Sequence, residues 1–151
     1  MIQYILILFV SATLISCNST ETIAQENNFS ASYETWAAGV RGGGSGVNFY
    51  VNLKTELSEE IELKKVIFRG YEVPFEKQNA LHFIARIKTE GNQQKSDGDE
   101  SQIYTSPKNA LTLAENEAIL IFLKNGKEIR QTIKEVKEKP MLQYPSTKPK
   151  N

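Results

Sequence analysis

The sequence has little of what catalytic and metal sites need. It contains one cysteine and one histidine, and its only aspartates are Asp97 and Asp99. A Ser-His-Asp hydrolase needs a nucleophile, a base and an orienting group, and a zinc site needs several Cys or His ligands. His82 lies between Leu81 and Phe83, which predicts a histidine exposed on one face of a strand. We therefore expect no enzyme, no catalytic residues, no metal and no cofactor.

The sequence also lacks a surplus of charge. It has 18 basic and 18 acidic side chains, whereas nucleic-acid-binding proteins normally carry a basic surplus, so we expect no nucleic-acid partner. Gly43–Val47 narrowly misses the G-x-S-x-G elbow of hydrolases, which needs a strand-to-helix turn. Asp97–Glu100 could gather oxygens around Ca²⁺ but lacks the EF-hand spacing, and acidic turns of this kind are usually solvated loops.

Long hydrophobic runs are absent except at the N-terminus. Residues 2–15 are uncharged and mostly apolar, a length that suits a signal peptide and falls short of the roughly 18 residues of a membrane span. The run ends in Leu14-Ile15-Ser16-Cys17. This segment resembles the lipobox of a bacterial lipoprotein signal peptide, although residues 1–4 contain no Lys or Arg. The alternatives are a short uncleaved membrane anchor and an ordinary buried cysteine.

The lipobox resemblance implies a cellular location. Residues 1–16 would be removed as the signal peptide, and Cys17 would carry a diacylglycerol and usually an N-acyl chain. Two or three acyl chains give stable membrane anchoring, since each buried methylene contributes ~0.8 kcal/mol. The membrane would then be one partner, and the location would be the bacterial cell envelope, with the outer membrane as the expected site.

Composition divides the remaining chain into three parts. Residues 17–28 are polar and lack the apolar content needed to fold alone, so we expect a flexible tether. Residues 29–139 carry the alternating patterns of a folded domain. Residues 140–151 are rich in Pro and Lys, and we expect a loosely ordered tail.

Period-2 alternation dominates the domain. Residues 47–54 alternate apolar and polar side chains, which predicts a strand with one buried face. Residues 33–40 are its expected hairpin partner. Residues 61–68 switch phase midway, which predicts a bulge. Further strands are expected at residues 71–75, 81–87 and 118–123, the last of them central and covered on both sides.

The end of the domain admits two interpretations. Asn125-Gly126 is a strong hairpin signal, but Ile129, Ile133 and Val136 also fit a helical spacing. The two-residue turn favours a strand at residues 128–133. About seven short strands with almost no helical pattern predict an all-β fold, an antiparallel, immunoglobulin-like β-sandwich.

The domain also resembles small β-sandwich lipoproteins of the Bacteroidota of unknown function. The resemblance rests on residues 36–46, Trp-Ala-Ala-Gly-Val-Arg-Gly-Gly-Gly-Ser-Gly, and on the closing hairpin with Lys124-Asn125-Gly126-Lys127. It covers roughly residues 30–137 and implies no activity.

The candidate contact residues gather around the glycine-rich segment. Its backbone N–H groups could form an anion-binding nest, although glycines more commonly serve a wide hairpin through positive φ angles. Exposed aromatic rings could stack on sugars or anchor a protein, although a lone Trp more often fills a core. The candidates are Trp36, Arg41, Gly42, Gly43, Gly44, Ser45 and Tyr50.

The sequence therefore predicts a lipid-anchored, non-enzymatic interaction or accessory module that contacts an envelope protein or a glycan. The alternative is a small-ligand or glycan-binding lipoprotein that uses residues 41–46 and the nearby aromatics. A hydrolase ranks third.

Overall fold

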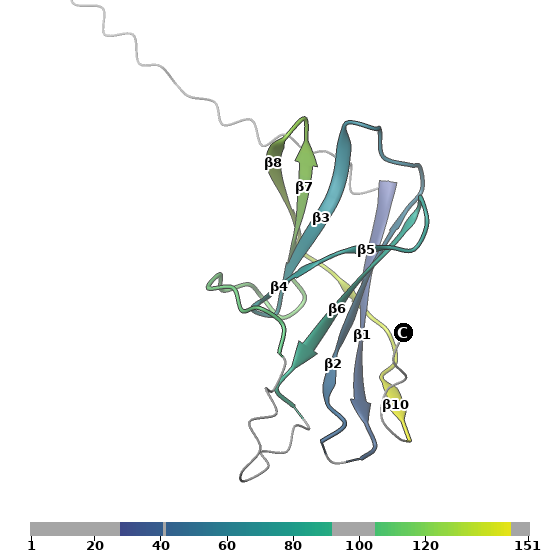
Figure 1. Cartoon of the computed structure of the whole chain (residues 1–151), viewed down its shortest axis with the longest axis vertical. Coiled ribbons are helices and arrows are strands. Elements are labelled where there is room, and N and C mark those ends of the chain that lie inside the picture. The colour runs from purple at the N-terminus through teal and green to yellow at the C-terminus, as the bar shows by residue number, and fades with distance from the viewer. Residues whose placement is uncertain (1–27, 41, 92–104, 146–151) are drawn as a thin grey trace, which may run out of the picture.

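The computed structural model describes residues 28–40, 42–91 and 105–145. Their strands form two sheets packed face to face (Figure 1). The first sheet has the order β10-β1-β2-β6-β5, with β9 also paired to β1, and comprises β1 (Phe29–Ala38), β2 (Ser45–Leu53), β5 (Glu76–Lys77), β6 (His82–Thr89), β9 (Lys137–Glu138) and β10 (Leu142–Tyr144). The second has the order β4-β3-β7-β8, comprising β3 (Ile61–Phe68), β4 (Tyr71–Pro74), β7 (Ala118–Lys124) and β8 (Lys127–Ile133).

This strand order is immunoglobulin-like. One sheet carries β1, β2, β6 and β5, the other carries β4, β3, β7 and β8, and this division matches the two sheets of that architecture. The predicted all-β sandwich is therefore confirmed. The strand count differs, because the short β5, β9 and β10 were not among the expected strands.

The core lies between the sheets and is built by alternation. Phe49 on β2, Phe68 on β3 and Phe122 on β7 are fully buried, and the rings of Phe49 and Phe68 are 5.0 Å apart at 60°. Tyr33 on β1 also packs against Phe68, with centroids 5.0 Å apart. These edge and tilted contacts suit the ring quadrupoles, and they join the two sheets.

The predicted bulge in β3 is present. Leu63 pairs with Phe122, but the next pair is Lys65 with Ile121, so Lys64 has no partner on β7. The carbonyl of Lys64 instead accepts the backbone N–H of Phe75. An extra residue in one strand changes the face on which later side chains lie, which explains the phase switch in the sequence.

Two tight turns in the second sheet have the same backbone shape. Asn125 and Gly126 join β7 to β8 with φ angles of 50° and 79°. Arg69 and Gly70 join β3 to β4 with φ angles of 48° and 77°. Two positive φ values match the twist of a β-hairpin. The strand interpretation of residues 128–133 is confirmed, because β8 pairs with β7 along its whole length.

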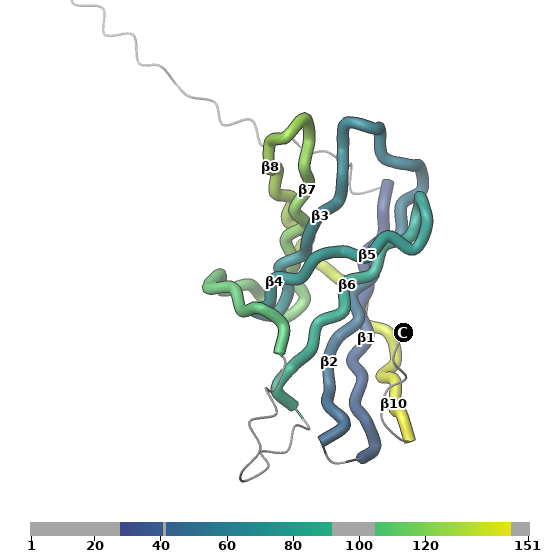
Figure 2. Tube along the Cα trace, viewed as in Figure 1, coloured from purple at the N-terminus to yellow at the C-terminus, as the bar shows by residue number. Residues whose placement is uncertain are grey.

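The C-terminal segment extends the first sheet beyond the expected domain boundary at residue 139. β10 pairs in parallel with β1, with Trp36 opposite Leu142 and Ala38 opposite Tyr144. Figure 2 shows this yellow segment alongside β1. Residues 142–144 lie in the segment for which a loosely ordered tail was expected, and the structure places them instead as an edge strand.

Candidate functional site

Several residues singled out in the sequence lie outside the residues that the structure describes. These are the lipobox with Cys17, Arg41 of the glycine-rich segment, and the acidic turn at residues 97–100. The predictions made for them remain predictions.

The glycine-rich segment forms the turn between β1 and β2. Gly42 and Gly44 have φ angles of 81° and 85°, conformations that glycine adopts without steric cost. The N–H of Ala38 donates to the carbonyl of Gly44, with N and O 3.1 Å apart. The Ser45 hydroxyl lies 2.7 Å from the Thr89 hydroxyl oxygen, so it ties the hairpin to β6. These glycines therefore shape a hairpin.

Trp36 is buried, but it lies outside the core between the sheets. By alternation it faces outward from the first sheet, where it pairs with Gly46. Tyr144 of β10 meets its ring edge-on at 6.3 Å. A Cβ atom at Gly46 would clash with the Ile87 carbonyl oxygen and would lie 2.7 Å from the Trp36 Nε1, so only glycine fits between them. With 6% of its surface exposed, Trp36 is not an open stacking platform.

Tyr50 faces outward from β2 and is half-buried, as the alternation predicted. Its hydroxyl donates to the Glu34 carboxylate, which also accepts from the Asn48 side-chain amide at 3.1 Å. The Lys139 ammonium lies 4.4 Å from the centre of the Tyr50 ring. Burial, and then the hydrogen bond to Glu34, raise the pKa of Tyr50 to about 12. Tyr50 is thus held in a polar cluster rather than presented as a free ring.

His82 is exposed at the start of β6, as predicted. Its Nδ1 lies 2.7 Å from the Asn52 side-chain oxygen. Asn52 is an amide, so this contact does not place a carboxylate beside the imidazole. Within residues 28–40, 42–91 and 105–145, no three His, Cys, Asp or Glu side chains group as a metal site would require. The same residues include no helix long and apolar enough to cross a membrane.

A pocket of about 300 Å³ opens at the end of the sandwich where the glycine-rich hairpin lies. Figure 1 shows β1, β2 and β6 continuing past the β3–β4 end of the second sheet. Inward-facing side chains at these strand ends therefore lie beside the β3–β4 turn rather than against a strand of the second sheet. The pocket is bordered by Thr35, Trp36, Ala37, Ser45, Gly46, Val47, Arg69, Tyr71, Ile87, Thr89 and Met141.

Arg69 is the charged residue that borders this pocket. Its Nη2 donates to the Tyr33 hydroxyl at 2.8 Å, and its Nε donates to the Glu115 carbonyl at 3.2 Å. The guanidinium carbon lies 4.6 Å from the centre of the Tyr33 ring. Burial raises the pKa of the Tyr33 hydroxyl, and the nearby Arg69 charge partly offsets that effect. Arg69 is therefore fixed in place where the core meets the pocket.

The pocket was missed by reasoning from the sequence because its parts come from both sheets. Ser45 is the candidate whose side chain faces inward there, and the pocket also borders Trp36. Arg69 was not among the candidates, and Tyr71 was expected only as the first residue of a strand and as one of the nearby aromatics. One local signal was available: Arg69-Gly70 occupies the kind of turn for which Asn-Gly is the favoured sequence.

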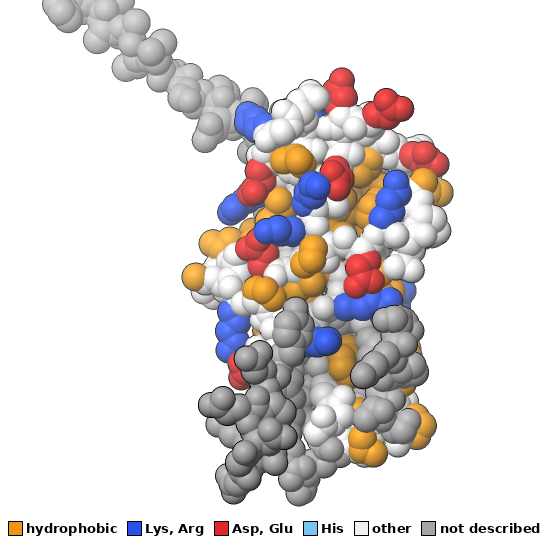
Figure 3. All heavy atoms as spheres, in the orientation of Figure 1, with side chains coloured by type: hydrophobic (Ala, Val, Ile, Leu, Met, Phe, Trp, Pro, Cys, Tyr) orange, Lys and Arg blue, Asp and Glu red, His pale blue; other side chains and the backbone are white. Residues whose placement is uncertain are grey.

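The described part of the surface seen in Figure 3 carries no large patch of one charge sign that would suggest a second binding site. Figure 3 shows acidic and basic side chains interspersed over the described part of this face. Comparison with protein-family models finds no match to the chain, and comparisons with curated proteins and with solved structures find none either.

Proposed function

We propose that this chain is a lipid-anchored envelope protein whose sandwich serves as a non-enzymatic binding module for a small ligand. The observation that supports it is the pocket of about 300 Å³ beside the glycine-rich hairpin. Ligand sites are typically concave, mostly apolar and supplied with a few placed polar groups. Val47, Ile87 and Met141 supply apolar lining here, and Arg69 supplies a fixed charge.

A second candidate is a protein partner that adds a strand to β8. This strand pairs with β7 on one side, and no other strand pairs with it among the described residues. An open edge of seven residues is a template for strand addition. However, Lys127, Glu128 and Arg130 line this edge strand, and charged side chains are a common means of discouraging such pairing. The pocket therefore ranks first.

The lipid anchor can be tested through Cys17. We expect Cys17→Ala to abolish labelling by a fatty-acid probe and to leave an unprocessed precursor, because only the thiol can accept the diacylglycerol. The control is the wild-type chain with Cys17, expressed at the same level. Equal labelling of both proteins would defeat the lipoprotein proposal.

The binding function can be tested by filling the pocket. Ala37 lies on its border and faces inward from β1, so Ala37→Phe would occupy the space. Ser30→Phe places the same ring on the exposed outward face of the same strand. We expect Ala37→Phe, and not Ser30→Phe, to fail to complement deletion of the gene while both remain folded and anchored. Full complementation by Ala37→Phe would reject the pocket as the functional site.

A further inference from the structure

We propose that the ligand of this pocket is a small organic anion with an apolar body, a carboxylate in its simplest form, and that Arg69 binds its charged group. This inference rests on the proposed function and names the chemistry of its ligand. Three features carry it: the backbone at Arg69, the surroundings of its guanidinium, and the lining of the pocket.

The backbone at Arg69 is in an unfavourable conformation for arginine. Among the described residues, the non-glycine positions with positive φ are Arg69 and Asn125. Asn tolerates this conformation because its short side chain bonds locally, whereas long side chains do not share that advantage. The second turn of the same shape, Asn125-Gly126, shows the residue that the geometry prefers. A residue held against backbone preference points to a role for its side chain.

The groups in direct contact with the Arg69 guanidinium are neutral, while the Glu138 and Glu115 carboxylates act on the Tyr33 hydroxyl to which it is bonded. The neutral groups are the Tyr33 hydroxyl, the Glu115 carbonyl, and the faces of the Tyr33 and Phe68 rings. The other arginines that the structure describes pair with carboxylates: Arg86 with Glu76 at 3.1 Å and Arg130 with Glu128 at 2.9 Å. The two bonds of Arg69 use two of its five N–H donors. A fixed positive charge with donors to spare is what a carboxylate recognises.

The pocket sets the size and character of the rest of the ligand. Val47, Ile87, Ala37 and Met141 are apolar, and Tyr71 adds an aromatic ring. At about 300 Å³, the pocket lies at the lower end of the size range of ligand pockets, so its occupant is a small molecule. The occupant is therefore a compact apolar group that ends in an anion, and Met141, half-exposed at the border, can adjust to its shape.

Phenylacetate and phenylacetamide are suitable probes, because they have the same shape and nearly the same size and differ in charge. We expect the full wild-type chain, in a non-ionic detergent, to bind phenylacetate at least about tenfold more tightly than phenylacetamide by isothermal titration calorimetry. The preference should weaken as salt is raised, because it depends on charge.

Arg69→Asn is the matching variant, since Asn occupies the same position in the Asn125-Gly126 turn. We expect it to fold and to bind both probes equally weakly. Arg69→Lys keeps the charge without the planar fork and should retain part of the preference. Arg86→Asn removes an arginine paired to Glu76 away from the pocket, and should leave the preference unchanged.

Equal affinity of the wild-type chain for the two probes would overturn the inference, and this comparison needs no variant to fold. If neither probe binds while Ala37→Phe still fails to complement, the anion chemistry is rejected and the proposed function stands. If phenylacetate binds selectively while Ala37→Phe complements fully, the anion site stands and the proposed function is rejected.

Discussion

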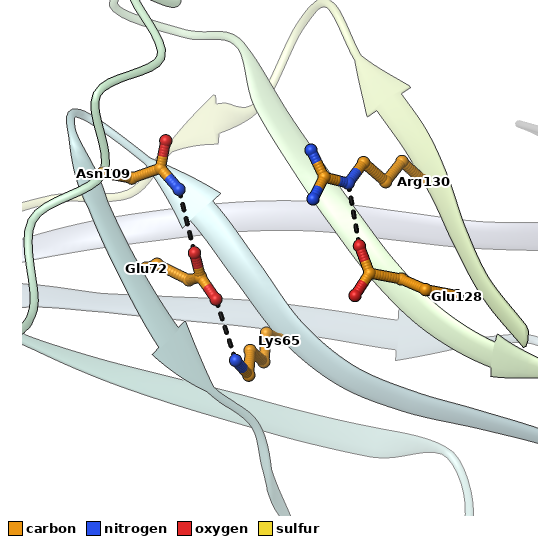
Figure 4. A network of polar contacts seen from close by, with 5 residues as sticks. All are labelled: Lys65, Glu72, Asn109, Glu128 and Arg130. Carbon is orange, nitrogen blue, oxygen red and sulfur yellow. Dashed lines mark hydrogen bonds and ion pairs between the residues drawn. The ribbon is translucent and has the colours of Figure 1, made fainter. Parts of the chain in front are cut away.

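Glu72 shows how a single side chain on the second sheet links stability to pH. Its carboxylate accepts from the Lys65 ammonium at 2.8 Å and from the Asn109 side-chain amide at 2.8 Å, as Figure 4 shows. Hydrogen bonds from Lys65 and then Asn109 hold the pKa of Glu72 below its ordinary value. The carboxylate thereby joins β3, β4 and the segment that precedes β7.

The sign of the pH effect follows from this lowered pKa. The stabilisation is present above the ordinary Glu pKa of 4.5 and is lost as the pH falls through the lower value of the folded protein. We expect Glu72→Gln to reduce the free energy of unfolding by up to about 1 kcal/mol near pH 7. The reduction should vanish under strongly acidic conditions, as measured by urea unfolding over a pH series.

Glu128 offers the matched control for this prediction. Its bond to Arg130, also drawn in Figure 4, is 2.9 Å long, and both side chains are more than half exposed. Exposed pairs of this kind contribute little, so Glu128→Gln should barely change stability at any pH. A loss at Glu72 that stayed constant down to acid pH would contradict the proposed role of its charge.

At the scale of the strand, β2 separates a dry face from a polar one. Phe49 is 0% exposed and packs against Phe68, whereas Tyr50 lies on the opposite face with its hydroxyl on Glu34. We expect Phe49→Ala to destabilise the domain by about 3–5 kcal/mol and Tyr50→Ala to cost clearly less. Chemical unfolding of both variants measures the difference, and equal losses would refute the assignment of the two faces.

Strands with clear alternation could be predicted from the sequence, because burial of one strand face places apolar side chains at every second residue. β2 shows this pattern, and the phase switch within residues 61–68 predicted a bulge, which the structure places at Lys64. β5 and β9 have two residues each and β10 has three, too few for any period to appear. Their place in the sheet depends on contacts with distant residues rather than on local pattern.

The candidate site was less predictable for a related reason. The sequence indicated Trp36 and Tyr50 as aromatic contacts, but it did not show that Tyr144 and Lys139 would lie against them. Arg69 reaches the pocket because the β3–β4 turn lies beside the ends of β1 and β6, which is a property of the topology. Only the unusual position of Arg69 in a tight turn could be recognised from the neighbouring sequence.

At the scale of the whole molecule, the C-terminal segment completes the first sheet. Tyr144 packs on Trp36, and its carbonyl accepts the backbone N–H of Gly39. We expect removal of residues 140–151 to lower the free energy of unfolding by about 1–3 kcal/mol, because it uncovers a buried ring and leaves a backbone donor without its partner. Thermal and urea unfolding of the shortened chain would measure this loss.

The control for that prediction is a smaller truncation. Removal of residues 146–151 leaves β10 and Tyr144 in place, so stability should match that of the full chain. If both truncations behave alike, the pairing of β10 with β1 contributes nothing measurable, and the domain boundary expected at residue 139 would be adequate.

The direction of β1 has a consequence for the position of the pocket. The strand begins at Phe29, on the side of the chain that leads back to Cys17, and ends ten residues later at Ala38, beside the pocket. At about 3.3 Å per residue, its length is roughly 33 Å. With lipid on Cys17, the domain would be attached through the end of β1 opposite the pocket, and a flexible tether would leave its tilt free. The pocket would then lie at the end of the domain far from the lipid attachment, and a longer tether would not change that separation.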